Sequence, residues 1–130
     1  MARNYHVDIA AFAAGADRKW VDNLLSHFVV PGVESARQGV ARRLSINAIQ
    51  TVVLVRALAS DTGLSIDRAL STANDLLASS DGRVRGDTAW ITLQIDRSAF
   101  QAEVDRRVAE AVEAVVPRKR GRPAARRDGK

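Results

Sequence analysis

Cysteine is absent from this 130-residue chain, which excludes disulfide bonds, thiolate nucleophiles and thiolate metal ligands. No run of 18 apolar residues occurs, so we expect no transmembrane helix and no membrane partner. The first eight residues contain no basic region that leads into a long apolar stretch. We therefore expect no signal peptide and a cytoplasmic protein.

Groups that could carry catalysis are also scarce. The two histidines, His6 and His27, fall in different predicted elements and have no acidic partner at metal-ligand spacing. Asp81 and Asp87 lie near a predicted turn, where two carboxylates make a poor cation site. The chain has no glycine-rich loop that could cradle a phosphate. We expect neither an enzyme, nor a cofactor, nor a metal centre.

Positive charge is concentrated in the last fourteen residues. The whole chain has 20 basic and 15 acidic residues, and 7 and 1 of these lie in residues 117–130, which leaves 13 and 14 in the remainder. A segment so basic, poor in apolar side chains and interrupted by Pro and Gly cannot bury a core, which predicts disorder in the free protein. Its expected partner is a polyanion, with double-stranded DNA the first candidate.

The basic segment resembles an AT-hook, a motif that lays an extended Arg-Gly-Arg core into the minor groove of A·T-rich DNA. Glycine lets the backbone approach the groove floor, arginines spread along the narrow negative groove, and prolines keep the chain extended. Many hooks have Pro directly before the core, where this chain has Lys119. The alternative is a basic tail that only raises solubility. The hook candidates are Arg118, Lys119, Arg120, Gly121, Arg122 and Pro123.

Near the N-terminus, two short helices are predicted on either side of a glycine. Residues 7–14 have apolar side chains at helical spacing, Gly15 ends the helix, and Asp17 is placed to cap a second helix over 18–27. Two short helices joined by a tight turn are typical of a helix-turn-helix, and an ordinary helical hairpin is the alternative. In the second helix, the candidates for groove or phosphate contacts are Arg18, Lys19, Trp20 and Asn23.

The next segment predicts a β-turn and a long helix. Pro31-Gly32 ends the second helix, and Gln38-Gly39 is a possible hairpin turn. Ser45 is a plausible N-cap for a helix from Ile46 to about Ser60. The expected core face of this helix consists of Ile46, Ile49, Val53 and Leu54.

Residues 5–78 resemble the N-terminal DNA-binding domain of the MerR superfamily. The matching features are the helix-Gly-helix, Gly39 with Arg42-Arg43, Leu44-Ser45 before a third helix, and a fourth helix after 63–65. The chain has Leu44 where the family usually has an aromatic residue, and Trp20-Val21-Asp22 where it usually has Thr-Leu-Arg. The resemblance implies a winged helix-turn-helix whose second helix enters the major groove. It also implies that Arg42 and Arg43 contact the DNA from the wing.

Downstream, the pattern predicts a helix over 64–78, a β-hairpin between residues 83 and 95, and a helix from Ser98 to Val116. The last helix carries an apolar stripe that packs either on the hairpin of its own chain or on a second copy. In the MerR family a C-terminal helix dimerises the protein, which favours a homodimer. The dimer or partner candidates are Phe100, Val104, Val108 and Val112.

The sequence therefore predicts a mainly α protein with small β elements: a DNA-binding domain over 1–80, a hairpin and helix over 81–116, and a basic tail over 117–130. The expected function is that of a nucleoid-associated DNA-binding transcriptional regulator, most simply a repressor. One alternative is an antitoxin-type autoregulator that binds a partner protein through residues 82–116. Another is an excisionase-like or architectural protein that bends DNA.

Overall fold

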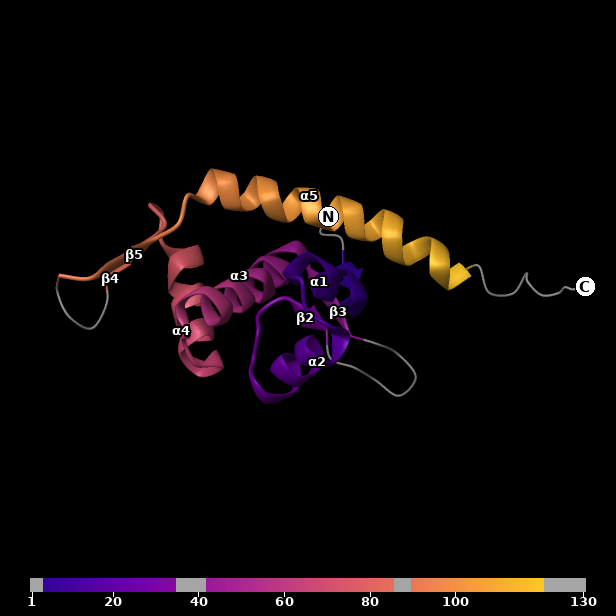
Figure 1. Ribbon diagram of the computed structural model, residues 1–130, viewed down its shortest axis with the longest axis horizontal. Coiled ribbons are helices and arrows are strands. Elements are labelled where there is room, and N and C mark those ends of the chain that lie inside the picture. The colour runs from indigo at the N-terminus through magenta and orange to yellow at the C-terminus, as the bar shows by residue number, and fades with distance from the viewer. Residues whose placement is uncertain (1–3, 35–41, 86–89, 121–130) are drawn as a thin grey trace, which may run out of the picture.

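The structure is a computed structural model that describes residues 4–34, 42–85 and 90–120, with side chains up to Ala114. It is mainly helical with small antiparallel sheets, which confirms the predicted fold class at that level (Figure 1). The helices are α1 Val7–Ala14, α2 Arg18–His27, α3 Ile46–Thr62, α4 Ile66–Ala78 and α5 Arg97–Arg120. The strands are β1 Asn4–His6, β2 Val33–Glu34, β3 Arg43–Ser45, β4 Arg83–Arg85 and β5 Thr92–Gln94.

Helices α1 and α2 begin and end where their capping residues predicted. Gly15 ends α1 in the left-handed conformation with φ of 68°, which costs glycine little because it has no Cβ. Asp17 caps α2, since its Oδ1 accepts a hydrogen bond from the backbone N–H of Trp20 at 3.0 Å. The inner face of α2 consists of Val21 and Leu24, both buried. These local signals hold the two helices against each other with a turn of three residues.

A three-stranded antiparallel sheet in the order β1-β3-β2 lies beside these helices. Leu44 at the centre of β3 is fully buried and pairs with Tyr5 of β1 on one side and Val33 of β2 on the other. The sequence did not predict β1. The Gln38-Gly39 turn expected between β2 and β3 lies outside the described residues.

Helix α3 is the centre of the core. The Ser45 hydroxyl caps it by accepting from the N–H of Ala48 at 3.2 Å, as predicted, and Gly63 ends it in the left-handed conformation. The predicted core face was too narrow, because side chains on nearly every side of the helix are buried while Ile46 at its start is only half-buried. The buried residues are Ala48, Ile49, Thr51, Val52, Val53, Leu54, Val55 and Leu58.

Helix α4 and the hairpin that follows lie at one end of the molecule (Figure 1). The predicted helix began two residues early, because the Ser65 hydroxyl caps α4 by accepting from the N–H of Arg68 at 3.3 Å. The predicted hairpin is present: β4 and β5 pair antiparallel, with Val84 opposite Leu93. Trp90, just before β5, is 81% exposed. No helix in the described part of the chain is both long and apolar enough to cross a membrane.

Helix α5 packs along α1 and also contacts α3. Asp96 caps it, since its Oδ1 accepts from the N–H of Ala99 at 3.0 Å. Val104 is fully buried and Val108 nearly so, whereas Phe100 and Val112 pack on the same core and are half-buried. The apolar stripe therefore packs within its own chain. Its contact is α1 rather than the hairpin, and Val104 and Val108 are not available to a second copy.

The outer face of α5 carries a cluster of ion pairs. Arg106 and Glu110 form an ion pair at 2.5 Å, and Glu103 accepts hydrogen bonds from Arg106 at 2.6 Å and Arg107 at 2.8 Å. These two hydrogen bonds, the one from Arg106 first, lower the pKa of Glu103 to about 2. Arg107 also donates to the carbonyl of Ala13 at 2.9 Å. It thereby brings positive charge to the negative end of α1, which has no basic residue of its own there.

The end of α5 differs from the prediction. We placed the last helical residue at Val116 and expected disorder from Pro117, but the helix continues to Arg120. Pro117 lacks the N–H that would continue the hydrogen-bond ladder, so the helix loses one bond at this position. The three basic residues that follow are good helix formers, and they extend a helix already anchored on α1. Residues 121–130 lie outside the described residues.

Replacing Val104 with alanine tests the packing of α5 on α1. We expect Val104→Ala to lower the free energy of unfolding by about 1.5–3 kcal/mol, because two buried methyl groups are lost and a cavity remains. Asp105→Ala, one position along on the exposed face, should stay within about 0.5 kcal/mol. Urea unfolding of both variants measures the difference. Equal effects would show that α5 is not packed as described.

Candidate nucleic-acid interface

The outward face of α2 carries polar side chains at helical spacing. Lys19, Asn23, Ser26 and His27 are all exposed, and they lie opposite the buried pair of Val21 and Leu24. Three of the four predicted contact residues of this helix, Arg18, Lys19 and Asn23, are exposed, and Lys19 and Asn23 lie on this outward face. We call the four exposed residues the α2 ridge.

The first turn of α2 holds two cations at the positive end of the helix. Arg18 and Lys19 open the helix and no acidic residue lies in that turn. Cations in this position oppose the helix macrodipole, at a cost of about 0.3–1 kcal/mol each when exposed. Lys19 forms no ion pair with any described residue. The N-terminal end of a helix together with two cations stabilises an anionic group, and the Asp17 carboxylate already accepts from the N–H of Trp20 at this end.

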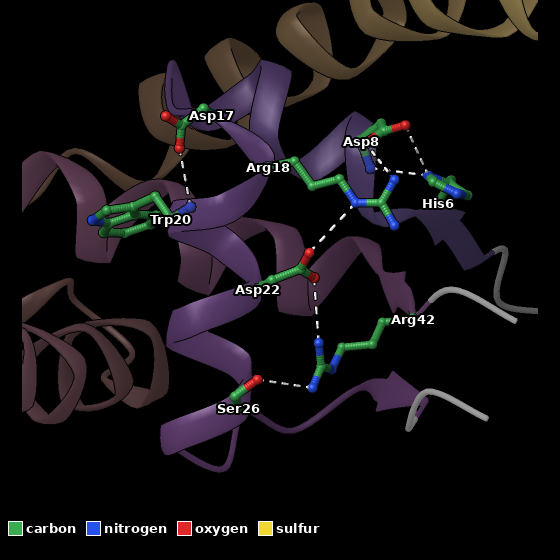
Figure 2. A network of polar contacts seen from close by, with 8 residues as sticks. All are labelled: His6, Asp8, Asp17, Arg18, Trp20, Asp22, Ser26 and Arg42. Atoms are coloured by element: carbon green, nitrogen blue, oxygen red, sulfur yellow. Dashed lines mark hydrogen bonds and ion pairs between the residues drawn. The ribbon is translucent and has the colours of Figure 1, made fainter. Parts of the chain in front are cut away.

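A chain of polar contacts runs along the side of α2 (Figure 2). Arg18 lies 3.5 Å from Asp8 of α1 and 3.4 Å from Asp22, one turn further along α2. Arg42, which directly precedes β3, contacts the other oxygen of Asp22 at 3.3 Å and donates to the Ser26 hydroxyl at 3.1 Å. The network joins α1, α2 and the approach to β3, and so fixes how the helix sits against the sheet.

His6 extends the network at the start of α1. Its Nδ1 accepts a hydrogen bond from the backbone N–H of Asp8 at 3.0 Å and so acts as the N-cap. The same nitrogen lies 3.4 Å from the Asp8 carboxylate. An accepting Nδ1 carries no proton, so the 3.4 Å contact is not a charge pair in this arrangement. His6 therefore has a structural role in capping α1.

The structure separates the two predicted wing arginines. The side chain of Arg42 is only 21% exposed and points at α2, where Asp22 and Ser26 hold it. Arg43 is exposed on β3, opposite Glu34 of β2, and forms no ion pair with any described residue. Arg42 thus positions the strand, whereas Arg43 is placed to reach a partner.

Trp20 lies on the side of α2 that faces away from the network of Arg18, Asp22 and Arg42 (Figure 2). It is half-buried, and the guanidinium of Arg56 from α3 sits 4.9 Å from the centre of its ring. Beside it is an open apolar cavity of about 330 Å³ between α2 and the first residue of α4. The lining residues are Trp20, Asn23, Leu24, His27, Phe28 and Ile66. Trp20 therefore contributes to packing as well as to the margin of the ridge.

Several functional residues were not identified from the sequence. Asp8 and Asp22 orient the arginines, Ser26 holds Arg42, and Arg56 covers Trp20. Helical spacing signals only the pair of Arg18 and Asp22, at i and i+4. The other contacts join elements up to 36 positions apart, and no local pattern reports them.

The predicted hook residues are only partly described. Arg118, Lys119 and Arg120 belong to the last turn of α5, and Gly121, Arg122 and Pro123 lie outside the described residues. No group of three potential metal ligands occurs within the described residues. Comparisons with models of protein families and with curated proteins find no match to this chain.

A double-mutant cycle tests the network along α2. We expect Asp22 and Arg42 to be coupled by roughly 0.5–1.5 kcal/mol of folding free energy, and Asp22 and Arg18 by at most about 0.5 kcal/mol. The difference follows from exposure, since the side chain of Arg42 is 21% exposed and that of Arg18 is 49% exposed. Unfolding of Asp22→Ala, each arginine→Ala and both double variants gives the two couplings. Equal values would contradict a positioning role specific to Arg42.

Proposed function

We propose that this protein binds double-stranded DNA with α2 in the major groove and the β2–β3 segment beside it, as a winged helix-turn-helix does. One observation carries the proposal: α2 has an exposed polar ridge on one face, a buried apolar face behind it, and a network that holds its side. A helix supported in this way presents its outer side chains rigidly, and the major groove, about 12 Å wide, admits one helix.

Within this proposal, the ridge residues have different roles. The amide of Asn23 can form paired hydrogen bonds with an adenine base edge, which depends on sequence. Lys19 at the helix end is suited to a phosphate, which positions the protein without reading sequence. Ser26 and His27 are further along the same face. Arg18 is half-exposed and can exchange its carboxylate partners for a phosphate.

The strand beside α2 supports a second contact. Arg43 is exposed on β3, and Arg42 next to it ties that strand to α2. A phosphate contact from Arg43 would therefore have a fixed position relative to the ridge. This is the arrangement that the resemblance to the MerR superfamily implies, and it remains a proposal for this chain.

The basic C-terminal segment supplies the third part of the proposal. Residues 117–130 carry seven positive charges and one negative charge. Such a segment releases counterions from DNA and gives affinity that falls steeply with salt. Linked through α5 to the helix-turn-helix, it raises the overall affinity through effective concentration. The Arg-Gly-Arg core then contacts an A·T-rich minor groove near the main site.

The role we propose is transcriptional regulation, most simply repression, in a protein without catalytic activity that associates with the nucleoid. Partner binding through the hairpin region is a second candidate, because Trp90 is 81% exposed and Ile91 is 44% exposed. Large exposed apolar side chains in adjacent positions are typical of contact surfaces.

Two substitutions on the ridge separate the roles of its residues. Asn23→Ala should cost about 1–3 kcal/mol on the preferred duplex and relax the preference at one base pair. Lys19→Ala should weaken binding to all duplexes alike and reduce the salt slope by about 1. Arg85→Ala removes the same charge from β4, at the end of the molecule away from α2 (Figure 1), and should change neither. Selection from random duplexes and salt titration are the measurements. Unchanged selection by Asn23→Ala would exclude α2 as the reading helix.

Two further variants test the basic segment. A chain that ends at Val116 should keep its sequence preference but lose affinity and much of its salt dependence, because a net charge of +6 is removed. Gly121→Ala keeps every charge and should lower only the preference for A·T-rich flanks, since a Cβ keeps the backbone from the groove floor. If both variants select the same flanks as the full chain, the segment acts only through its charge. If the shortened chain loses all sequence preference, α2 is not the reader.

A further inference from the structure

The outer edge of β5 in the hairpin β4–β5 has no strand partner among the described residues. The sheet has two strands, and β5 pairs only with β4 among the described residues. Two-stranded hairpins are marginal unless further strands or a helix support them. Here the helical body supports the hairpin on one side, where β4 contacts α4. The rest of the hairpin extends beyond the helical body (Figure 1).

The register shows which backbone groups face outward. Arg83 pairs with Gln94, which places Gly82 opposite Ile95, and the N–H of Ile95 donates to the carbonyl of Gly82 at 2.9 Å. In an antiparallel pair, residues that bond the partner strand alternate with residues that point away. Leu93 and Ile95 therefore face β4, and the N–H and C=O groups of Thr92 and Gln94 face outward.

The composition of this edge is unusual for an exposed strand. Proteins protect open edges with charged side chains, prolines or bulges. Residues 90–95 read Trp-Ile-Thr-Leu-Gln-Ile, which contains no charge and no proline. The neighbouring strand β4 reads Arg-Val-Arg and is charged on its exposed face. Of the two outer edges of this sheet, the one that belongs to β4 is charged and the one that belongs to β5 is neutral and β-prone, which indicates that a strand pairs at β5.

We propose that β5 of a second copy pairs antiparallel with this edge, around a two-fold axis at Leu93, to form a four-stranded sheet. In that register Thr92 lies opposite Gln94 of the second copy, so the outward N–H and C=O groups satisfy one another. Leu93 lies opposite Leu93 of the second copy, and Ile91 lies opposite Ile95 of the second copy. These residues form one apolar row across the interface. We choose a second copy of the chain as the partner because β5 alone supplies both of the strands that pair in this register.

Charge and exposure support the same occupant. No charged side chains of β5 oppose one another across the axis, so the contact carries no like-charge cost. The end of α5, where the basic segment begins, lies at the opposite end of the molecule (Figure 1), so its repulsion acts at a distance. Trp90, now 81% exposed, lies beside the new strand and becomes covered there. This interface replaces the α5 stripe as the dimer contact.

Sedimentation without DNA tests the association independently of the proposed function. The full chain should form dimers whose dissociation constant rises at least about tenfold in Thr92→Pro, since two outward donors are lost per dimer. Proline fits an edge strand when its N–H faces away from the existing partner, so the monomer should unfold at nearly the same temperature. Thr92→Val, which keeps the donor, is the control. A chain that remains monomeric, or a dimer unaffected by Thr92→Pro, would overturn the proposal.

Disulfide formation tests the register, because the natural chain has no cysteine. Paired residues that do not bond each other across an antiparallel pair have Cα atoms about 4.5 Å apart, within disulfide range. Leu93→Cys should therefore cross-link to its own copy under mild oxidation. Thr92→Cys should not cross-link, because the two copies of residue 92 are offset from each other by two positions in the proposed pairing. Val84→Cys, the β4 partner of Leu93, should also remain monomeric. Cross-linking at Thr92 or Val84 but not at Leu93 would falsify this register.

Discussion

Burial of α3 on nearly every side is the constraint on which the other elements depend. Its apolar residues follow one another with too little polar interruption for a single-sided helix, so α1, α4 and α5 must all cover it or its neighbours. A buried central helix has few alternative orientations, because close packing resists small shifts. The elements around it therefore have fixed positions, and only their outer surfaces are free to carry function.

The same constraint explains why α2 can be both exposed and well placed. Only Val21 and Leu24 of α2 are buried, while Trp20 and Leu25 pack against the core and are half-buried. The position of α2 comes from the tight turn after α1 and from the polar chain through Asp22 to Arg42. A helix held by its ends and one side keeps its outer face unobstructed. In this arrangement the weak polar contacts set the orientation of α2, whereas the buried core supplies most of the stability.

Local signals in the sequence predicted much of this fold. Gly15, Asp17 and Ser45 act within four residues of their own positions, and the bounds of α1 and α2 and the start of α3 agreed with them. Non-local features were missed. Strand β1 depends on pairing with β3 across some 40 positions, and the α5 stripe has a periodicity that does not identify what it packs against. Local helical spacing was enough to predict that Lys19 points outward. The role of Arg42 could not be predicted in this way, because it depends on a contact with Ser26 in another element.

Helix α5 also sets a length scale for the molecule. Its 24 residues rise by 1.5 Å each, so the helix spans about 36 Å from the residues after the hairpin to Arg120, within the basic segment. That distance is close to one turn of B-form DNA. The two ends of the helix thus differ in chemistry, since one follows the neutral strand β5 and the other lies in the strongly cationic segment. A rigid rod of this length keeps them apart, so each end can engage its own partner without competing with the other.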